Sequence, residues 1–331
     1  MAQVQEKIKA KVMAYDKIAT DIVRIELADP NGHALPEFTA GSHIDLHLPT
    51  TPELIRQYSL ANDPIENHRY VIGVLREANS RGGSVAVHDR LAVGTIVTIS
   101  APRNAFALNE TASHSILCAG GIGITPLLAM AQRLLRLKQS FELHYCVRSA
   151  DRAAFMEILR RPEFADKIFL HCDDGDAAQK FDPKSVFGKA AGSATTHLYC
   201  CGPNGFMSYV LDAARAQKWP EERLHVEYFG AKPMEVSTEA ASVGSFKVIA
   251  KKSGKEFTLQ PGQSIAKTLI KGGIPIPVSC ESGICGTCLT KVIEGRPDHQ
   301  DSFQTDKEKA SNKSMTVCCS GSLDPVIVLD V

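Results

Sequence analysis

The sequence of 331 residues lacks a long apolar run. A membrane-spanning helix needs about 20 predominantly apolar residues, and no stretch of this chain provides them. The first residues, MAQVQEKIKAKVMAYD, also lack the apolar core of a signal peptide. We therefore expect a cytoplasmic protein without a membrane association.

The chain also lacks an excess of charge of either sign. Its 37 Lys and Arg residues balance 37 Asp and Glu residues, so no global field would draw it onto nucleic acid. Apolar residues make up 44% of the chain and charged residues 22%, which is ordinary for folded globular protein. At about 150 residues per domain, the length predicts two or three domains.

Three segments of different texture follow one another. Residues 1–110 contain short alternating strands such as VRIEL and HIDLHL between turns, which predicts an antiparallel β-barrel. Residues 111–230 alternate strands and helices and predict a doubly wound α/β domain with a parallel sheet. Residues 231–243 are small and polar, as in a linker. Residues 244–331 begin with a predicted hairpin and a helix over 264–271.

Cysteines are concentrated near the end of the chain, in CESGICGTC. Without export, a disulfide framework is not expected, and clustered cysteines indicate metal or cofactor ligation. Cys280, Cys285 and Cys288 have the spacing C-x4-C-x2-C, and Cys318 follows after 29 intervening residues. This spacing is typical of a plant-type [2Fe-2S] cluster. A structural zinc site usually has two C-x2-C-type pairs, and incidental burial does not explain three cysteines in nine residues.

Two glycine-containing turns in the second segment each end a strand and open a helix. CAGGIGITP is the first, with Thr125 expected as the helix N-cap and Pro126 at the first helical position. YCCGPNGF is the second, and in a parallel sheet both turns would lie at the carboxyl edge, where a pyrophosphate can bind. Pro126 replaces the third glycine of the usual dinucleotide fingerprint, so a tight turn without a ligand is the alternative.

The first segment contains two candidate phosphate contacts. In RQYSL, a strand would place Arg56 and Tyr58 on one face, where a guanidinium could bind a phosphate and a phenol ring could lie against a flat heterocycle. In SRGGS, Gly82 and Gly83 could form a nest of N–H groups, with Ser84 as the cap of a short helix. The alternative is a surface arginine beside a half-buried tyrosine.

With these motifs assembled, the chain resembles the phthalate dioxygenase reductase family over essentially its full length. RQYSL, SRGGS, GGIGITP, YCCGP, EYF and CESGICGTC all match. The resemblance implies three domains: a β-barrel flavin domain, an α/β nucleotide domain and an α+β β-grasp ferredoxin domain. It also implies FMN, NADH and a [2Fe-2S] cluster as cofactors, and a terminal oxygenase of the Rieske type as the partner.

The same resemblance implies roles for individual residues of the first two segments. Arg56 and the turn from Gly82 to Ser84 would hold the FMN phosphate, and Tyr58 and Ser59 would contact the flavin ring. Further cofactor contacts are implied for Gln57, Val74, Arg76, Gly120, Gly121, Gly123, Thr125, Pro126, Gly202 and Pro203.

Four residues are expected around the nicotinamide nucleotide. By resemblance, Cys201 would lie beside the nicotinamide and Phe229 at the flavin face; packing in a strand is the alternative for both. Asp173 would reach an NADH ribose, although acidic turn residues are usually solvated, and Arg148 would lie nearby.

The fourth cluster ligand must be chosen between Cys318 and Cys319. Adjacent residues in an extended chain point to opposite sides, so only one of them would face the iron. The interval before Cys318 is the one typical of the family. We therefore expect Cys318 to be the ligand and Cys319 to be packing.

The expected function is electron transfer from NADH through FMN and the cluster to an oxygenase, in the catabolism of aromatic or related small molecules. Two alternatives remain. One is a reductase for another acceptor, such as a cytochrome or a ferredoxin. The other is a non-enzymatic iron-sulfur sensor.

We predict that NADH is preferred over NADPH, because no cluster of Lys or Arg follows the second strand of the nucleotide segment to neutralise a 2′-phosphate. Only Arg148 and Arg152 lie near that position. Steady-state kinetics with both nucleotides test the preference. An equal or higher kcat/KM with NADPH would contradict it.

Overall fold

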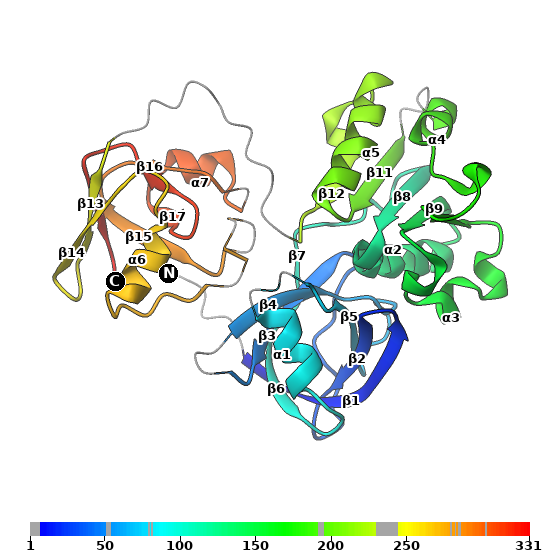
Figure 1. Cartoon of the computed structure of the whole chain (residues 1–331), viewed down its shortest axis with the longest axis horizontal. Helices are drawn as coiled ribbons and strands as arrows, with labels where there is room; N and C mark the ends of the chain where they lie inside the picture. The colour runs from blue at the N-terminus through cyan, green and yellow to red at the C-terminus, as the bar shows by residue number, and fades with distance from the viewer. Residues whose placement is uncertain are drawn as a thin grey trace. The chain divides into compact units, whose positions relative to one another are not determined.

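The computed structural model divides into a first unit, which ends at Phe229, and a second unit, which begins at Gly230 (Figure 1). The predicted linker 231–243 and Cys285 lie outside the described residues. The structure describes residues 7–50, 54–78, 80, 82–190, 195–229, 244–278, 280–281, 283, 286–301 and 303–331. Within these ranges, no helix has both the length and the apolar composition needed to cross a membrane.

The first sheet of the first unit is antiparallel and has the strand order β4-β3-β6-β1-β2-β5, with β7 paired to β3. Alternate residues such as Val23, Ile25 and Leu27 point into its core, as the period of two in the sequence predicts. An isolated bridge between Leu60 and Ile72 links the end of β4 to β5. The elements are β1 (Lys7–Ala19), β2 (Ile22–Ala28), β3 (Ser42–Leu48), β4 (Leu54–Ser59), β5 (Tyr70–Leu75), α1 (Gly83–Arg90), β6 (Ile96–Ser100) and β7 (Arg103–Asn104).

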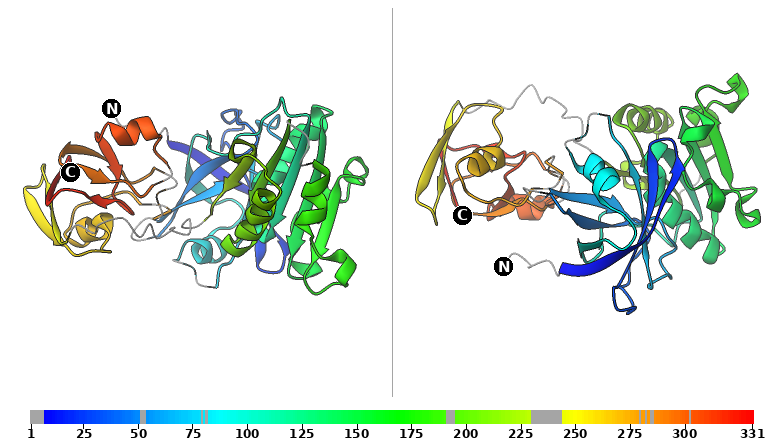
Figure 2. Two further views of the ribbon diagram at one scale, coloured as in Figure 1. Left: turned by 90° about the horizontal axis from the view of Figure 1, so that it is seen from above. Right: turned by 60° about the horizontal axis from the view of Figure 1, so that its bottom comes forward.

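The second sheet is parallel, with the order β10-β9-β8-β11-β12. Helix α2 packs on the face that contains Leu117, and α4 and α5 pack on the face that contains Ile116, so helices cover both sides (Figure 2). This agrees with the predicted doubly wound arrangement. The elements are β8 (His114–Gly120), α2 (Ile124–Arg136), β9 (Ser140–Val147), α3 (Met156–Leu159), β10 (Ile168–Cys172), α4 (Pro183–Ala190), β11 (Thr196–Cys201), α5 (Asn204–Ala216) and β12 (Leu224–Glu227).

The second unit contains a mixed sheet in the order β14-β13-β19-β15-β17 and a separate pair, β16 and β18. The predicted hairpin is confirmed as β13 and β14, and the predicted helix is α6, with Ser264 as its N-cap and Gly272 as its C-cap. The elements are β13 (Phe246–Ala250), β14 (Lys255–Leu259), α6 (Ile265–Lys271), β15 (Leu289–Glu294), β16 (Pro297–Asp298), α7 (Asp306–Ala310), β17 (Ser314–Thr316), β18 (Gly321–Ser322) and β19 (Val326–Leu329).

Two predicted helix caps are wrong. The N-cap of α2 is Gly123, and Thr125 lies inside the helix, because a single 3-10 turn over Gly121–Gly123 leads directly into it. The N-cap of α1 is Gly82, in the left-handed conformation with φ 87°, so Ser84 lies in the first turn. In both cases a glycine with positive φ, Gly121 before α2 and Gly82 before α1, lets the helix begin before the predicted capping residue.

The first and second sheets meet through close packing in the first unit. A methyl group added to Gly73 of β5 would lie 2.9 Å from Cγ2 of Thr125 and 3.0 Å from the ring of Phe155. Arg136 of α2 forms an ion pair of 2.5 Å with Asp63, which follows the first-sheet strand β4. These contacts bring the start of α2 next to β5.

We predict that Gly123→Ala destabilises the first unit, because its methyl group would lie 2.2 Å from the carbonyl oxygen of Cys201. Overpacking of this kind costs about 1–3 kcal/mol. Gly205→Ala is the matched control: Gly205 lies in the first turn of α5, and no described atom lies within 4 Å of the added carbon. Thermal unfolding should show a lower Tm for Gly123→Ala alone; equal Tm values for the two variants would contradict the prediction.

Candidate functional site

The site of the first unit is organised by β8 and β11, which are neighbours in the second sheet while their crossovers lead to opposite sides. Such a switch point opens a crevice at the carboxyl ends of the strands. Added methyl groups at Gly120 and Gly202 would lie 2.7 and 2.9 Å from the ring of Phe206. The two predicted turns are therefore in direct contact, and glycine is needed at these positions for their close approach.

Gly121 differs from the other glycines of this crevice. Its φ is 53°, and no described atom lies within 4 Å of a carbon added to it. Glycine is therefore required here by conformation and not by crowding. Pro203, the N-cap of α5, is exposed. An open turn of this kind at the start of a helix fits the predicted pyrophosphate contact.

Sequence reasoning missed Glu227, the last residue of β12. The Ser59 hydroxyl of β4 donates a hydrogen bond of 2.9 Å to its carboxylate. The residue keeps some exposed surface, but its carboxyl group lies inside the protein, and this burial raises its pKa to about 7. The motif EYF contained a sequence indication of this site, because it places an acidic residue at the end of a strand next to two aromatic residues.

Cys201 lies at the same place, as the last residue of β11 and directly beside Glu227 in the sheet. It is fully buried, and burial raises the pKa of its thiol well above the ordinary value. The thiol is therefore neutral and packed, as the alternative interpretation proposed. Its position next to Glu227 at the crevice keeps it among the candidates for a nicotinamide neighbour.

Phe229 ends the first unit and is 47% exposed. The alternative interpretation of Phe229 as a core strand residue is therefore wrong, because β12 ends at Glu227. A largely uncovered aromatic ring is costly in water unless a flat partner or a neighbouring surface covers it.

Arg148 and Asp173 follow the neighbouring strands β9 and β10, and both are exposed. The backbone N–H of Asp173 donates to the carbonyl of Val147, and that of Asp174 donates to the carbonyl of Arg148. The two residues therefore lie together at the same sheet edge as the glycine turns. This placement is compatible with contacts to a ribose.

The predicted phosphate site is at the start of α1. The side chain of Arg56 lies over Gly83: a methyl group there would be 2.4 Å from Nε of Arg56. A guanidinium at the positive end of a helix dipole is unfavourable by itself and becomes favourable when an anion joins it. Ser80, which sequence reasoning did not name, accepts hydrogen bonds from the Gly82 N–H at 3.1 Å and the Ser84 hydroxyl at 3.0 Å.

Neighbouring residues of β4 point alternately to two faces of the sheet. Tyr58 lies on the same face as Arg56 and packs against the core of the first sheet, and burial raises the pKa of its phenol. Gln57 points to the other face, where its amide donates to the buried carboxylate of Asp45 at 3.0 Å. A contact between Gln57 and a cofactor would therefore involve its backbone.

Val74 and Arg76 of the β5 region have structural partners. Val74 is 1% exposed and belongs to the core, and its carbonyl lies 3.0 Å from Nε2 of His88. Arg76 forms an ion pair of 2.6 Å with Asp89 on α1. The side chain of Val74 is thus unavailable to a ligand, and Arg76 would have to exchange a partner.

The predicted cluster ligands lie in the second unit. The thiol of Cys318 contacts those of Cys280, Cys288 and Cys319, and these neighbours raise its pKa. Thiols gathered in this way fit a cationic centre, which would favour their ionised forms. Among the described residues, no three His, Cys, Asp or Glu side chains already have metal-binding geometry, and Cys285 is not among those residues.

The expectation that Cys318 and Cys319 lie in an extended chain is wrong. They lie in a turn after β17, in which the N–H groups of Cys319 and Ser320 both donate to the carbonyl of Thr316. The sulfur of Cys319 lies 3.3 Å from Oγ1 of Thr316. Cys318 contacts Cys280 and Cys288, whereas the thiol of Cys319 contacts that of Cys318 and the hydroxyls of Thr316 and Ser320.

Glycines shape the cysteine loop. Gly283 and Gly286 have φ values of 73° and 71°. An added methyl group at Gly283 would lie 2.5 Å from the sulfur of Cys319, and one at Gly286 would lie 2.3 Å from the ring of Phe303. Both the conformation and the crowding therefore require glycine at these two positions.

Comparisons with known proteins match both units. Residues 117–212 match the model of the oxidoreductase NAD-binding domain, and residues 248–321 match that of the 2Fe-2S iron-sulfur cluster binding domain. The chain is 48% identical to the vanillate O-demethylase oxidoreductase of Pseudomonas sp. (strain HR199 / DSM 7063), over 98% of this chain and 100% of that protein. It is 43% identical to the tetrachlorobenzoquinone reductase of Sphingobium chlorophenolicum, over 98% of each.

A solved structure agrees with these relatives. Phthalate dioxygenase reductase, described as a modular structure for electron transfer from pyridine nucleotides to [2Fe-2S], superposes with a TM-score of 0.72. It is 39% identical in sequence, and the match covers 98% of each chain.

We predict that Cys318→Ser loses or severely perturbs the cluster, whereas Cys319→Ala keeps it, because Cys318 contacts both Cys280 and Cys288, whereas Cys319 contacts Cys318 and two hydroxyl groups. Visible absorption and the paramagnetic signal after reduction report the cluster. Flavin content should be unchanged in both variants, since the flavin contacts lie in the first unit. Loss of the cluster in Cys319→Ala with retention in Cys318→Ser would reverse the assignment.

We predict that Glu227 makes stability depend on pH. Its pKa rises from 4.5 in the unfolded chain to about 7, so its contribution is fully present below pH 4.5 and is lost as the pH rises through 7. Between pH 5 and 8 the free energy of unfolding should fall by about 1–3 kcal/mol from this group. Glu227→Gln should flatten that dependence in chemical unfolding experiments; an unchanged slope would show that the carboxyl is not buried as described.

Proposed function

This chain belongs to the phthalate dioxygenase reductase family, and on that basis we propose that it is the reductase component of a terminal oxygenase system. It is an oxidoreductase that uses NADH, FMN and a [2Fe-2S] cluster. When bound, the flavin accepts two electrons from NADH together and releases them one at a time through the cluster. The protein's own residues bind and orient these groups.

Within the first unit, the main support for the proposal is the hydrogen bond that Ser59 donates to Glu227. It joins the strand of the RQYSL motif to the end of β12, at the crevice beside β11. A flavin held along β4 and a nicotinamide held at the crevice would therefore face each other there. A protonated Glu227 could donate a hydrogen bond to a ligand. An ionised Glu227 would instead add a negative charge beside the nucleotide phosphates.

Residue roles follow from this arrangement. Arg56 and the N-terminus of α1 would hold the FMN phosphate, and Ser80 would release Gly82 and Ser84 to it. Tyr58 would lie against the flavin ring. Phe229 would cover the ring where nicotinamide enters, which gives its exposed side chain a flat partner.

The finer architecture is proposed in the same way. The bridge between Leu60 and Ile72 supports closure of the first sheet as a barrel over residues 1–110, followed by the nucleotide domain over 111–230. The parallel pairing of β13 and β19, with α6 between β14 and the cysteine loop in sequence, supports a β-grasp ferredoxin domain over 244–331.

The acceptor is proposed from the relatives. The vanillate O-demethylase oxidoreductase supports an oxygenase that acts on an aromatic compound. The tetrachlorobenzoquinone reductase supports a second candidate, in which the acceptor is a quinone and no oxygenase is needed. Both candidates use the same site in the first unit and differ only in the molecule that accepts the electrons.

A reconstituted assay separates the two candidates. The purified reductase is combined with the oxygenase component of a vanillate O-demethylase system, and NADH-dependent demethylation of vanillate is measured. A parallel assay follows tetrachlorobenzoquinone with the reductase alone. Demethylation that depends on the reductase and on an intact cluster supports the proposal, whereas rapid quinone reduction with no demethylation favours the second candidate.

A further inference from the structure

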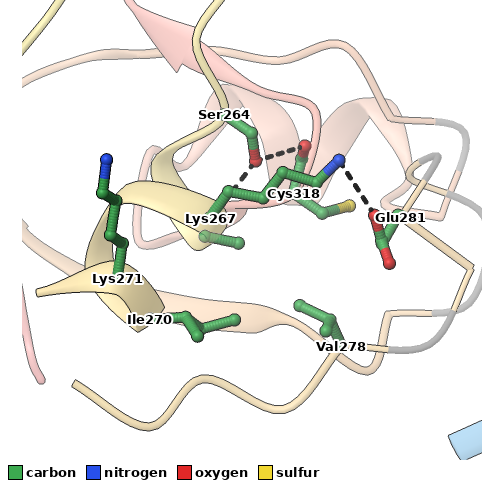
Figure 3. A pocket seen from close by; sticks show the side chains of 8 residues that line it. Ser264, Lys267, Ile270, Lys271, Val278, Glu281 and Cys318 are labelled. Carbon is green, nitrogen blue, oxygen red and sulfur yellow. Dashed lines mark hydrogen bonds and ion pairs between the residues drawn. The ribbon is translucent and has the colours of Figure 1, made fainter. Parts of the chain in front are cut away.

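A pocket of ≈ 240 Å³ opens beside α6 in the second unit (Figure 3). Its lining includes Lys267, Ile270 and Lys271 from the helix, Val278 from the segment before the cysteine loop, and Cys318. The pocket therefore combines an apolar wall, two lysines and the residue assigned as the fourth cluster ligand. The function proposed for the first unit makes no use of it.

Val278 of the apolar wall packs against the core of its own unit, whereas Ile270 stays partly exposed. Helix α6 is anchored by Ile265, Ala266 and Leu269, which are all fully or almost fully buried. Ile270 lies one turn after Ala266, lines the pocket and is 43% exposed. Beside the pocket and its two lysines, Ile270 offers an exposed apolar contact to a partner protein.

The rim of the pocket is basic. Its described lining includes Lys267 and Lys271, whereas Glu281 is the single carboxylate, and it pairs with Lys267 at 3.2 Å. The helix sequence IAKTLIK contains no acidic residue, and Nζ of Lys255 lies at the helix end, where it donates to the carbonyl of Gly272 at 2.8 Å. The charge of this surface is complementary to carboxylates.

Hydrogen bonds connect the helix beside the pocket to Cys318. The Ser264 hydroxyl accepts a hydrogen bond from the Lys267 N–H at 3.4 Å and donates one of 3.0 Å to the carbonyl of Cys318 (Figure 3). The cap of α6 thus holds the backbone of the ligand residue at the pocket. A protein seated here would lie beside the residue that would hold the cluster.

We propose that this surface, formed by Lys267, Ile270, Lys271 and Val278, is where the protein acceptor of the electrons docks. The occupant is an acidic face of that acceptor, with an apolar side chain that enters the pocket beside Ile270 and carboxylates that reach the lysines. With the cluster bound, one electron would pass from it to the acceptor near Cys318, so that the cluster is oxidised and the acceptor is reduced by one electron. The inference rests on the proposed reductase function and adds the exit surface to it.

Two protein acceptors of opposite charge test the surface without knowledge of the natural partner. Plastocyanin is acidic and cytochrome c is basic, and both accept one electron. Lys271→Glu should slow the reduction of plastocyanin about three- to tenfold at low ionic strength and accelerate that of cytochrome c, with both effects disappearing at high salt. Ile270→Ser should slow plastocyanin without changing the salt dependence.

Lys307→Glu is the matched control, because it makes the same change of charge at an exposed lysine on α7 outside the pocket. It should leave both rates nearly unchanged. Reduction of ferricyanide by NADH should be the same in all variants. Effects of Lys307→Glu equal to those of Lys271→Glu would show that only net charge matters and would overturn the proposal, as would unchanged rates in Lys271→Glu.

A structural readout completes the test. Carbodiimide joins lysines to carboxylates in contact, so cross-linking with plastocyanin followed by peptide mapping should find Lys267 or Lys271. Cross-links confined to other lysines would overturn the proposal. Failure of the reductase function itself would look different: the wild-type protein would then show no cluster-dependent reduction of either acceptor.

Discussion

The contact between the turns after β8 and β11 is the constraint on which the first unit depends. The backbone at Gly123 approaches the carbonyl of Cys201 so closely that a single methyl group would collide with it. Because β8 and β11 send their helices to opposite sides, this contact forms the floor of the crevice. This contact fixes the positions of the glycine turn before α2, the start of that helix and the buried thiol of Cys201.

The first sheet completes the crevice from the other side. Gly73 of β5 has no side chain, which lets Thr125 and Phe155 pack against that strand. The same approach allows Ser59 to reach Glu227. A carboxyl group that would be ionised in water is thereby moved into a setting where burial favours its neutral form. Packing between the two sheets thus determines the chemistry at the place where the predicted cofactors would meet.

Several elements could be predicted because their cause is local. The β13–β14 hairpin, the helix after Ser264 and the alternation that produces the second sheet follow from periodicity and capping residues close in sequence. The caps at Thr125 and Ser84 were predicted wrongly, because glycines earlier in each turn allowed the helix to begin sooner. Capping preference is a weak local effect that turn geometry can override.

The sequence by itself determined the spacing of the four cysteines, the order of the three segments and the family to which they belong, since each depends only on which residues follow one another. Tertiary structure decided the rest. It gave Glu227 its partner and its raised pKa, placed Cys318 and Cys319 together in a turn, and left Phe229 and Ile270 exposed. These properties depend on contacts between residues far apart in the chain, and no local pattern records burial or the approach of a distant strand.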